Sequence, residues 1–135
     1  MVSEARAREA ILVSLAQNSE TNLKDEDAAL TRYLAVVEGN SFLGTSDQYS
    51  ALNGVARVLA KRGRFEEALG ALQRVDLEKL QGVWLSQFQL WNADTLAAAA
   101  RPAEARAMYQ RLLADTNAEE RFKKLAAEKI SKLPQ

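Results

Sequence analysis

Cysteine and histidine are both absent from this sequence of 135 residues. Their absence excludes disulfide bonds, thiolate nucleophiles, the most frequent zinc ligands and the side chain most often used for proton transfer near neutral pH. The commonest types of metal centre and of nucleophilic catalysis are therefore excluded. We predict that the protein is not an enzyme and has no catalytic residues, no metal site, no cofactor and no small-molecule substrate.

Proline and glycine are scarce, with two and six residues, whereas there are 24 alanines and 19 leucines. This composition is typical of helices, and no stretch alternates between apolar and polar residues as a strand would. A chain of this length can bury a sizeable core without covalent cross-links. We predict one all-α domain over residues 1–135.

An excess of charge of one sign is also missing, because 18 basic and 18 acidic residues cancel. No broad positive field can hold a phosphate backbone, so nucleic acid is not expected as a partner. No apolar run approaches the roughly 20 residues that span a bilayer, and the N-terminus lacks the pattern of a signal peptide. We expect a soluble chain that contacts a membrane only through an anchor absent from the sequence given.

The most informative stretch runs from Tyr49 to Asp76. Two apolar stripes with helical spacing are separated by a short break at residues 61–64, where Gly63 can adopt the left-handed conformation that ends a helix. A link this short turns the second helix back along the first. We predict an antiparallel helical hairpin in which Ala56 and Ala68 allow the two helices to approach closely.

The apolar spacing of the second helix occurs three times along the chain. Its members are Ala29, Tyr33 and Val36, then Ala68, Leu72 and Val75, then Ala105, Tyr109 and Leu112. The first alanines of these sets are 39 and 37 residues apart. We predict three hairpin units at about 3–38, 46–76 and 83–114, followed by a capping helix at about 118–133.

The first unit is predicted to begin with a helix from Ser3 to about Asn18, which buries Ala7, Ile11 and Leu15. Polar residues 18–22 are expected to end it. The next helix begins near residues 22–25, where short polar side chains can cap it, and continues to about Glu38.

Loops and caps are predicted from local chemistry. Phe42 and Leu43 are expected to fold back under the first unit from the loop at 39–44. Thr45 and Gln48 have the spacing of a capping box, in which each side chain bonds the backbone of the other residue. Asn117 with Glu120 is predicted to cap the last helix in the same way.

The stretch at 49–76 resembles one tetratricopeptide repeat, a helix-turn-helix unit of 34 residues. The resemblance depends on Ala56, Leu59, the turn at residues 63–65 and then Ala68 and Leu72. At the tryptophan-like first position this chain has Leu52, and no proline closes the unit. The resemblance implies an α-solenoid of stacked hairpins that serves as a non-catalytic scaffold for a peptide or partner protein.

The order of elements from Asp25 onward is similar to that of bacterial envelope proteins of the tetratricopeptide class, which include the membrane-anchored ancillary subunit of the Sec translocon. This resemblance implies a periplasmic domain of a membrane-anchored protein, with partners among translocon or chaperone components. It covers most of the chain.

Three polar residues lie four positions apart on the first helix of the central hairpin: Asn53, Arg57 and Lys61. In proteins of the resembled class the first helices line a concave surface. The resemblance therefore places these residues in a groove beside Gln87, Leu90 and Asp94 of the next unit. Such a basic strip could bind a carboxylate or an acidic peptide segment. The alternative is an ordinary solvated helix face.

Three aromatic residues, Trp84, Phe88 and Trp91, have helical spacing. They could form a buried seam or a partly exposed anchor for a partner. A different functional class also stays open, in which the ends of the stack or the face with Trp84 and Trp91 pair with a second copy. The chain would then be a self-association module that forms a homo-oligomer.

Ala68→Trp tests the predicted close approach of helices. A large ring at a helix crossing forces neighbouring side chains and backbone to shift, so we expect a loss of more than about 1 to 3 kcal/mol in unfolding free energy. Thermal unfolding followed by circular dichroism measures it. An unchanged melting temperature would place the crossing elsewhere.

Overall fold

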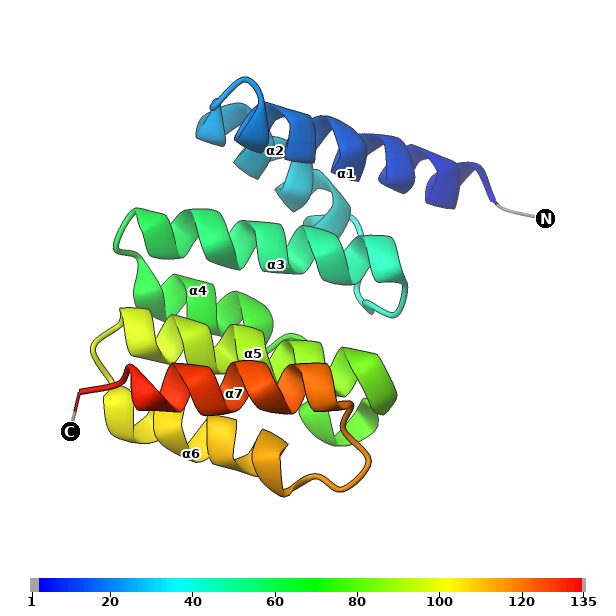
Figure 1. The fold of residues 1–135 in the computed structure, drawn as a ribbon. Coiled ribbons are helices and arrows are strands. Elements are labelled where there is room, and N and C mark those ends of the chain that lie inside the picture. Colours follow the sequence, from blue (N-terminus) through cyan, green and yellow to red (C-terminus); the bar gives the residue numbers. More distant parts are fainter. Residues whose placement is uncertain (1–2, 135) are drawn as a thin grey trace. The chain divides into compact units, whose positions relative to one another are not determined.

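The computed structural model describes residues 3–134, and every regular element in this range is helical (Figure 1). In chain order these elements are α1 (Glu4–Thr21), α2 (Glu26–Glu38), α3 (Ser46–Lys61), α4 (Phe65–Leu72), the short 3₁₀ helix η1 (Leu77–Lys79), α5 (Gly82–Ala98), α6 (Pro102–Ala114) and α7 (Glu120–Ser131). No strand occurs between residues 3 and 134. The all-α prediction is confirmed.

The chain divides into two compact units, Met1–Arg62 and Gly63–Gln135. The boundary falls between α3 and α4, which are the two helices of the hairpin predicted at 46–76. That hairpin and the single domain over 1–135 therefore stay predictions, and each unit is described by itself.

The first unit consists of α1, α2 and α3. Each of these helices packs against the other two, and successive helices run in opposite directions (Figure 1). Ser3 caps α1, because its hydroxyl accepts a hydrogen bond from the backbone amide of Arg6 at 3.2 Å. Asp25 caps α2 through the amide of Ala28 at 3.1 Å. The predicted start and end of α2 are confirmed.

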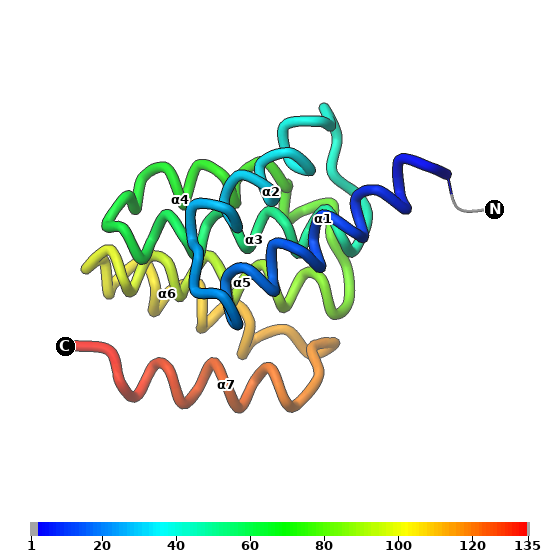
Figure 2. Tube along the Cα trace, turned by 90° about the horizontal axis from the view of Figure 1, so that it is seen from above, coloured from blue at the N-terminus to red at the C-terminus, as the bar shows by residue number. Residues whose placement is uncertain are grey.

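The second unit contains α4 to α7. Here α5 packs against α4, η1, α6 and α7, so it is the central helix of the unit. Figure 2 follows the chain from α6 into α7, which returns in the opposite direction. Pro102 is the first residue of α6, where its missing amide removes no helical hydrogen bond.

Each turn between a first and a second helix contains one residue with positive φ. These residues are Lys24 (52°), Gly63 (75°) and Ala100 (60°), which are 39 and 37 residues apart. The left-handed conformation of Gly63 confirms the prediction. The same separations relate the three buried alanines of the second helices, Ala29, Ala68 and Ala105, so the turn and the buried face repeat together.

The three predicted inward sets are confirmed. All nine residues are at most 8% exposed, and these residues are Ala29, Tyr33, Val36, Ala68, Leu72, Val75, Ala105, Tyr109 and Leu112. In the second unit, three residues of this group meet three buried residues of α5 in one cluster, which contains Ala105, Tyr109, Leu112, Leu90, Ala93 and Leu96. Helical periodicity therefore located the core of the second helices.

The buried face of α1 was predicted wrongly. Ile11 and Leu15 are 60% and 44% exposed, whereas Val13 and Ala16 are 4% and 0% exposed. Two stripes of similar spacing exist on this helix. The buried stripe is the one that contains Val13, Ala16 and Ser19, of which Ala16 is small and Ser19 is polar. Ser19, which is 1% exposed, accepts a hydrogen bond from the guanidinium of Arg32 on α2.

The end of α1 also differs from the prediction, because the helix continues through residues 18–22 to Thr21. The polar side chains expected to break it instead bond within it. The hydroxyl of Thr21 donates to the carbonyl of Gln17 at 2.7 Å, and the amide of Asn22 donates to the Asn18 side chain at 2.7 Å.

The capping box at Thr45 and Gln48 is confirmed, with both of its reciprocal hydrogen bonds present. The predicted cap at Asn117 and Glu120 is wrong. The side chain of Asp115 accepts from the amide of Asn117 at 2.9 Å, which holds residues 115–118 in a turn and delays the start of α7. No side chain caps α7.

The loop prediction at 39–44 is half right. Leu43 is 6% exposed, but its neighbour Phe42 is 78% exposed. Of these two neighbours, Leu43 occupies the inward position. Near Leu43, the Gln48 side chain also accepts from the amide of Gly44 at 2.8 Å, which fixes the end of the loop.

Gly54 on α3 lies directly against the ring of Tyr33 on α2. A Cβ added at this glycine would lie 2.5 to 2.6 Å from three ring atoms of Tyr33, closer than real Cβ contacts come. Tyr33 is fully buried, and its hydroxyl is held by a hydrogen bond to Glu20. The ring therefore has little freedom to move away.

We expect Gly54→Ala to lower the unfolding free energy by about 1 to 3 kcal/mol through overpacking, despite the better helix propensity of alanine. Gly70→Ala is the matched control, because Gly70 is also helical and has open space around its Cα. That change should raise stability by about 0.4 to 1 kcal/mol. Urea unfolding measures both, and equal effects of the two changes would contradict this packing.

Candidate functional site

A buried carboxylate joins the three helices of the first unit. Glu20, at the end of α1, accepts hydrogen bonds from Nε and Nη2 of Arg57 on α3 at 2.8 and 2.6 Å. It also accepts from the hydroxyl of Tyr33 on α2 at 2.9 Å. The Glu20 side chain is only 5% exposed, and that of Arg57 is 41% exposed. We name Glu20, Tyr33 and Arg57 the first polar node.

The pKa values in this node follow from its geometry. The hydrogen bonds from Arg57 hold the pKa of Glu20 below its ordinary value, although burial acts in the opposite direction. Burial, assisted by the bond to Glu20, raises the pKa of Tyr33 to about 12. Glu20 is thus ionised and Tyr33 is protonated at neutral pH.

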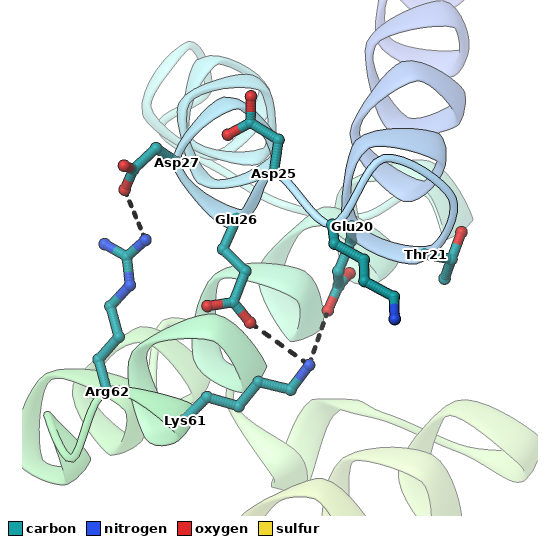
Figure 3. Close-up of a pocket in the computed structure, with 8 residues that line it drawn as sticks. Glu20, Thr21, Asp25, Glu26, Asp27, Lys61 and Arg62 are labelled. Atoms are coloured by element: carbon teal, nitrogen blue, oxygen red, sulfur yellow. Dashed lines mark hydrogen bonds and ion pairs between the residues drawn. The ribbon is translucent and has the colours of Figure 1, made fainter.

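Beside this node lies a cleft of about 580 Å³ at the turn between α1 and α2 (Figure 3). Lys61 reaches Glu26 at 3.5 Å and Glu20 at 3.9 Å, and Arg62 pairs with Asp27 at 2.5 Å. Each of these two cations is therefore already matched by a carboxylate. The cleft is lined by Glu20, Thr21, Lys24, Asp25, Glu26, Asp27, Lys61 and Arg62.

The second unit contains a similar but more exposed arrangement, in which the Asp94 and Lys129 side chains are 38% and 36% exposed. Asp94 on α5 accepts a hydrogen bond from the hydroxyl of Tyr109 on α6, and Lys129 on α7 contacts both of its carboxylate oxygens at 2.8 and 2.7 Å. Burial, with a further contribution from Asp94, raises the pKa of Tyr109. We name Asp94, Tyr109 and Lys129 the second polar node.

The two nodes occupy corresponding positions in the repeat. The charged residues Glu20, Arg57, Asp94 and Lys129 lie on α1, α3, α5 and α7, with separations of 37, 37 and 35 residues, and their signs alternate. A small residue precedes each of the two cations by three positions, Gly54 before Arg57 and Ala126 before Lys129. Tyr109 and Ala126 belong to one buried cluster.

The predicted binding residues are placed as follows. Arg57 and Lys61 lie on one side of α3 and share Glu20, whereas Asn53 is half-buried one turn earlier. Asp94 belongs to the second polar node, and Gln87 is half-buried on α5. Leu90 is 4% exposed and lies in the core of the second unit, so its predicted place in a groove is wrong.

Sequence reasoning named Arg57 and Asp94 but missed Glu20, Lys129 and the tyrosines of both nodes. Glu20 was assigned to a helix break, and Tyr33 and Tyr109 were treated as core residues without regard to their hydroxyls. The alternating charges at intervals near 37 residues were the available signal. A second signal was Gly54, because glycine inside a helix usually has a packing reason.

The aromatic residues of α5 were expected to form either a buried seam or a partly exposed anchor, and they differ in their burial. Phe88 is fully buried, whereas Trp84 and Trp91 are half-buried. The ring of Trp91 contacts Phe88 edge-on at 4.9 Å and lies 6.2 Å from Trp84. Phe88 is a core residue, Trp91 packs against it, and Trp84 packs against Trp91.

Within residues 3–134, no group of three or more acidic side chains is placed to hold a metal ion. No helix in the same range is long and apolar enough to cross a membrane. No family model matches the chain, and no curated protein or solved structure matches it significantly. The resemblance to tetratricopeptide proteins stays a prediction.

Glu20 makes stability dependent on pH in the acid range. Its folded pKa lies below the ordinary value of about 4.3, so the unfolded chain binds more protons there and the unfolding free energy rises with pH. The contribution of Glu20 is present above this value and is lost as pH falls through the folded pKa. We expect Glu20→Gln to flatten this part of the profile, as measured by urea unfolding between about pH 3 and pH 6.

Glu104→Gln is the matched control. Hydrogen bonds from Arg101 also lower the pKa of Glu104, but the Glu104 side chain is 56% exposed and its pair is screened by water. Its removal should change the profile less than removal of Glu20. If both variants retained the profile of the original protein, the acid-range dependence would come from other carboxylates.

Proposed function

We propose that this chain is a non-catalytic scaffold that binds a peptide or partner protein along the first helices of tetratricopeptide-like hairpins. The observation that carries the proposal is the recurrence of the polar node. Corresponding positions on α1, α3, α5 and α7 hold a charged residue at intervals of 37, 37 and 35 residues. A polar position that recurs on successive first helices supports the helical repeat on which a scaffold of this kind is built.

The protonation states of the nodes support a non-catalytic role. The pKa of Glu20 is lowered, and the pKa values of Tyr33 and Tyr109 are raised. Each of these shifts moves the group away from neutral pH, whereas a general acid or base works best with a pKa near the operating pH. The nodes are therefore suited to holding helices in position.

The chemistry of the partner follows from the charges around Arg57. The pairs with Glu20 and Glu26 neutralise Arg57 and Lys61, so this surface is polar without a net positive field. The cations keep part of their exposure, at 41% and 53% of their side chains. We propose that their remaining donors bind carbonyl oxygens of a peptide, in place of the acidic segment expected from the sequence.

The resemblance to bacterial envelope proteins extends the proposal to the partner's setting. We propose partners within an envelope or translocon-associated complex. This part depends on the resemblance of the elements from Asp25 onward, and the recurrence of the nodes supports the repeat on which that resemblance is based.

The test is capture of partners from a bacterial envelope extract by the immobilised chain, followed by titration with overlapping peptides of the captured protein. Asn53→Ala combined with Lys61→Gln should weaken binding at least about tenfold, equivalent to about 1.4 kcal/mol. Arg57 is left intact, because its removal would leave the buried carboxylate of Glu20 without its cation.

Lys132→Gln is the control for that double variant. Lys132, the C-cap residue of α7, also pairs with a glutamate, Glu128 at 3.2 Å, and its side chain is 72% exposed. It should bind like the unmodified chain. Retained affinity in the double variant, with unchanged helicity, would remove the surface around Arg57 from consideration.

A further inference from the structure

The outward face of α1 carries an apolar stripe that is not part of the core. Ala7, Ile11 and Leu15 follow one another at four-residue intervals, and Ile11 and Leu15 are 60% and 44% exposed. The opposite face of the same helix is buried through Val13 and Ala16. A surface helix normally places polar residues on its outward side, so this stripe requires an explanation.

The repeat shows what happens to the corresponding face elsewhere. Glu20 and Asp94 occupy equivalent positions 74 residues apart. With this shift, the stripe residues Ile11 and Leu15 correspond to Leu85 and Gln89, which are half-buried and 5% exposed. In the second unit α5 has α4 packed against it, whereas in the first unit α1 packs against α2 and α3. The exposed face of α1 is therefore one that this fold can cover with another helix.

The helix is held firmly in this orientation at both ends. Near its start, the carboxylate of Glu9 accepts hydrogen bonds from Asn40 at 2.6 Å and from Gln48 at 3.2 Å. Near its end, Glu20 is fixed by Tyr33 and Arg57. Rotation of α1 to bury the stripe would break both sets of bonds, so the apolar face stays outward.

The sequence of the outward face is complementary to itself in an antiparallel arrangement. When two copies of α1 are placed antiparallel with Ile11 against Ile11, Ala7 of each copy faces Leu15 of the other. The small residue lets the large one enter between neighbouring side chains. The flanking exposed residues also avoid like charges, because Arg8 faces Ser14 and Glu4 faces Asn18.

We propose that a second copy of this chain docks on the outward face of α1, antiparallel and related by a twofold axis at Ile11. Such an interface uses the same patch on both copies and closes as a dimer. One helix pair is smaller than the roughly 800 Å² per partner of a standard stable interface. The dimer is therefore weak and forms at high local concentration. It does not depend on the partner-binding surface around Arg57.

Because the chain has no cysteine, single introduced cysteines test the geometry directly. Ile11→Cys places the thiol at the proposed axis and should form a disulfide-linked dimer under mild oxidation. Ala7→Cys and Leu15→Cys should cross-link to each other when mixed, and each much less with itself. Leu125→Cys is the control, since Leu125 is 42% exposed on α7 and outside the interface.

Cross-linking of Ile11→Cys no faster than that of Leu125→Cys would overturn the proposal. So would a mixture of the Ala7 and Leu15 variants that cross-links no better than either variant alone, because that pair distinguishes antiparallel from parallel docking. Quantification on non-reducing gels after equal oxidation times gives both comparisons.

Sedimentation across a dilution series provides a test without a covalent bond. The average mass of the unmodified chain should rise with concentration, and Ile11→Arg should weaken this association at least about tenfold. Circular dichroism checks that the variant keeps its helices, which is expected because Ile11 is exposed. A monomer at all concentrations, or a dimer unaffected by Ile11→Arg, would overturn the proposal.

Discussion

In the first unit, one buried carboxylate fixes the arrangement of three successive helices, and in the second unit a more exposed carboxylate joins three helices. Glu20 bonds Tyr33 on α2 and Arg57 on α3, and Asp94 bonds Tyr109 on α6 and Lys129 on α7. An exposed ion pair contributes little to stability. Glu20, by contrast, is 5% exposed and accepts two hydrogen bonds from one guanidinium. Loss of either partner would leave a buried polar group unpaired, so the node strongly favours one rotation of α1 over others.

The residue at the tyrosine position of the node differs between the second helices. A tyrosine hydroxyl donates to a carboxylate and can also accept from a guanidinium, as the Tyr33 hydroxyl does from Arg57 at 3.5 Å. The second helices α2 and α6 follow first helices that carry Glu20 and Asp94, and they have tyrosine. The intervening helix α4 follows Arg57, and it has Leu72 at this position. The choice between tyrosine and leucine thus follows the alternating charge on the preceding helix.

Much of the fold was predictable because it depends on local chemistry. The inward sets on α2, α4 and α6 follow from helical spacing, and Gly63 and the Thr45 capping box follow from turn and cap preferences. The orientation of α1 was not predictable from spacing, because the stripe with Ile11 and Leu15 and the stripe with Val13 and Ala16 both have helical spacing. The bonds that decide between them join Glu20 to Arg57, which is 37 residues away. For the same reason, Arg57 and Lys61 were recognised as cations, but their carboxylate partners were not.

The pairing of Arg57 changes what this surface can recognise. A free arginine loses side-chain entropy when it binds, whereas Arg57 is already held by Glu20 and Tyr33. Its remaining donors are thus presented in a fixed direction at little further entropic cost. Because Glu20 already supplies the compensating charge, a second carboxylate would add like-charge repulsion near the first. A neutral acceptor avoids this repulsion, so, under the proposed function, the node favours a peptide backbone over an acidic side chain as the bound group.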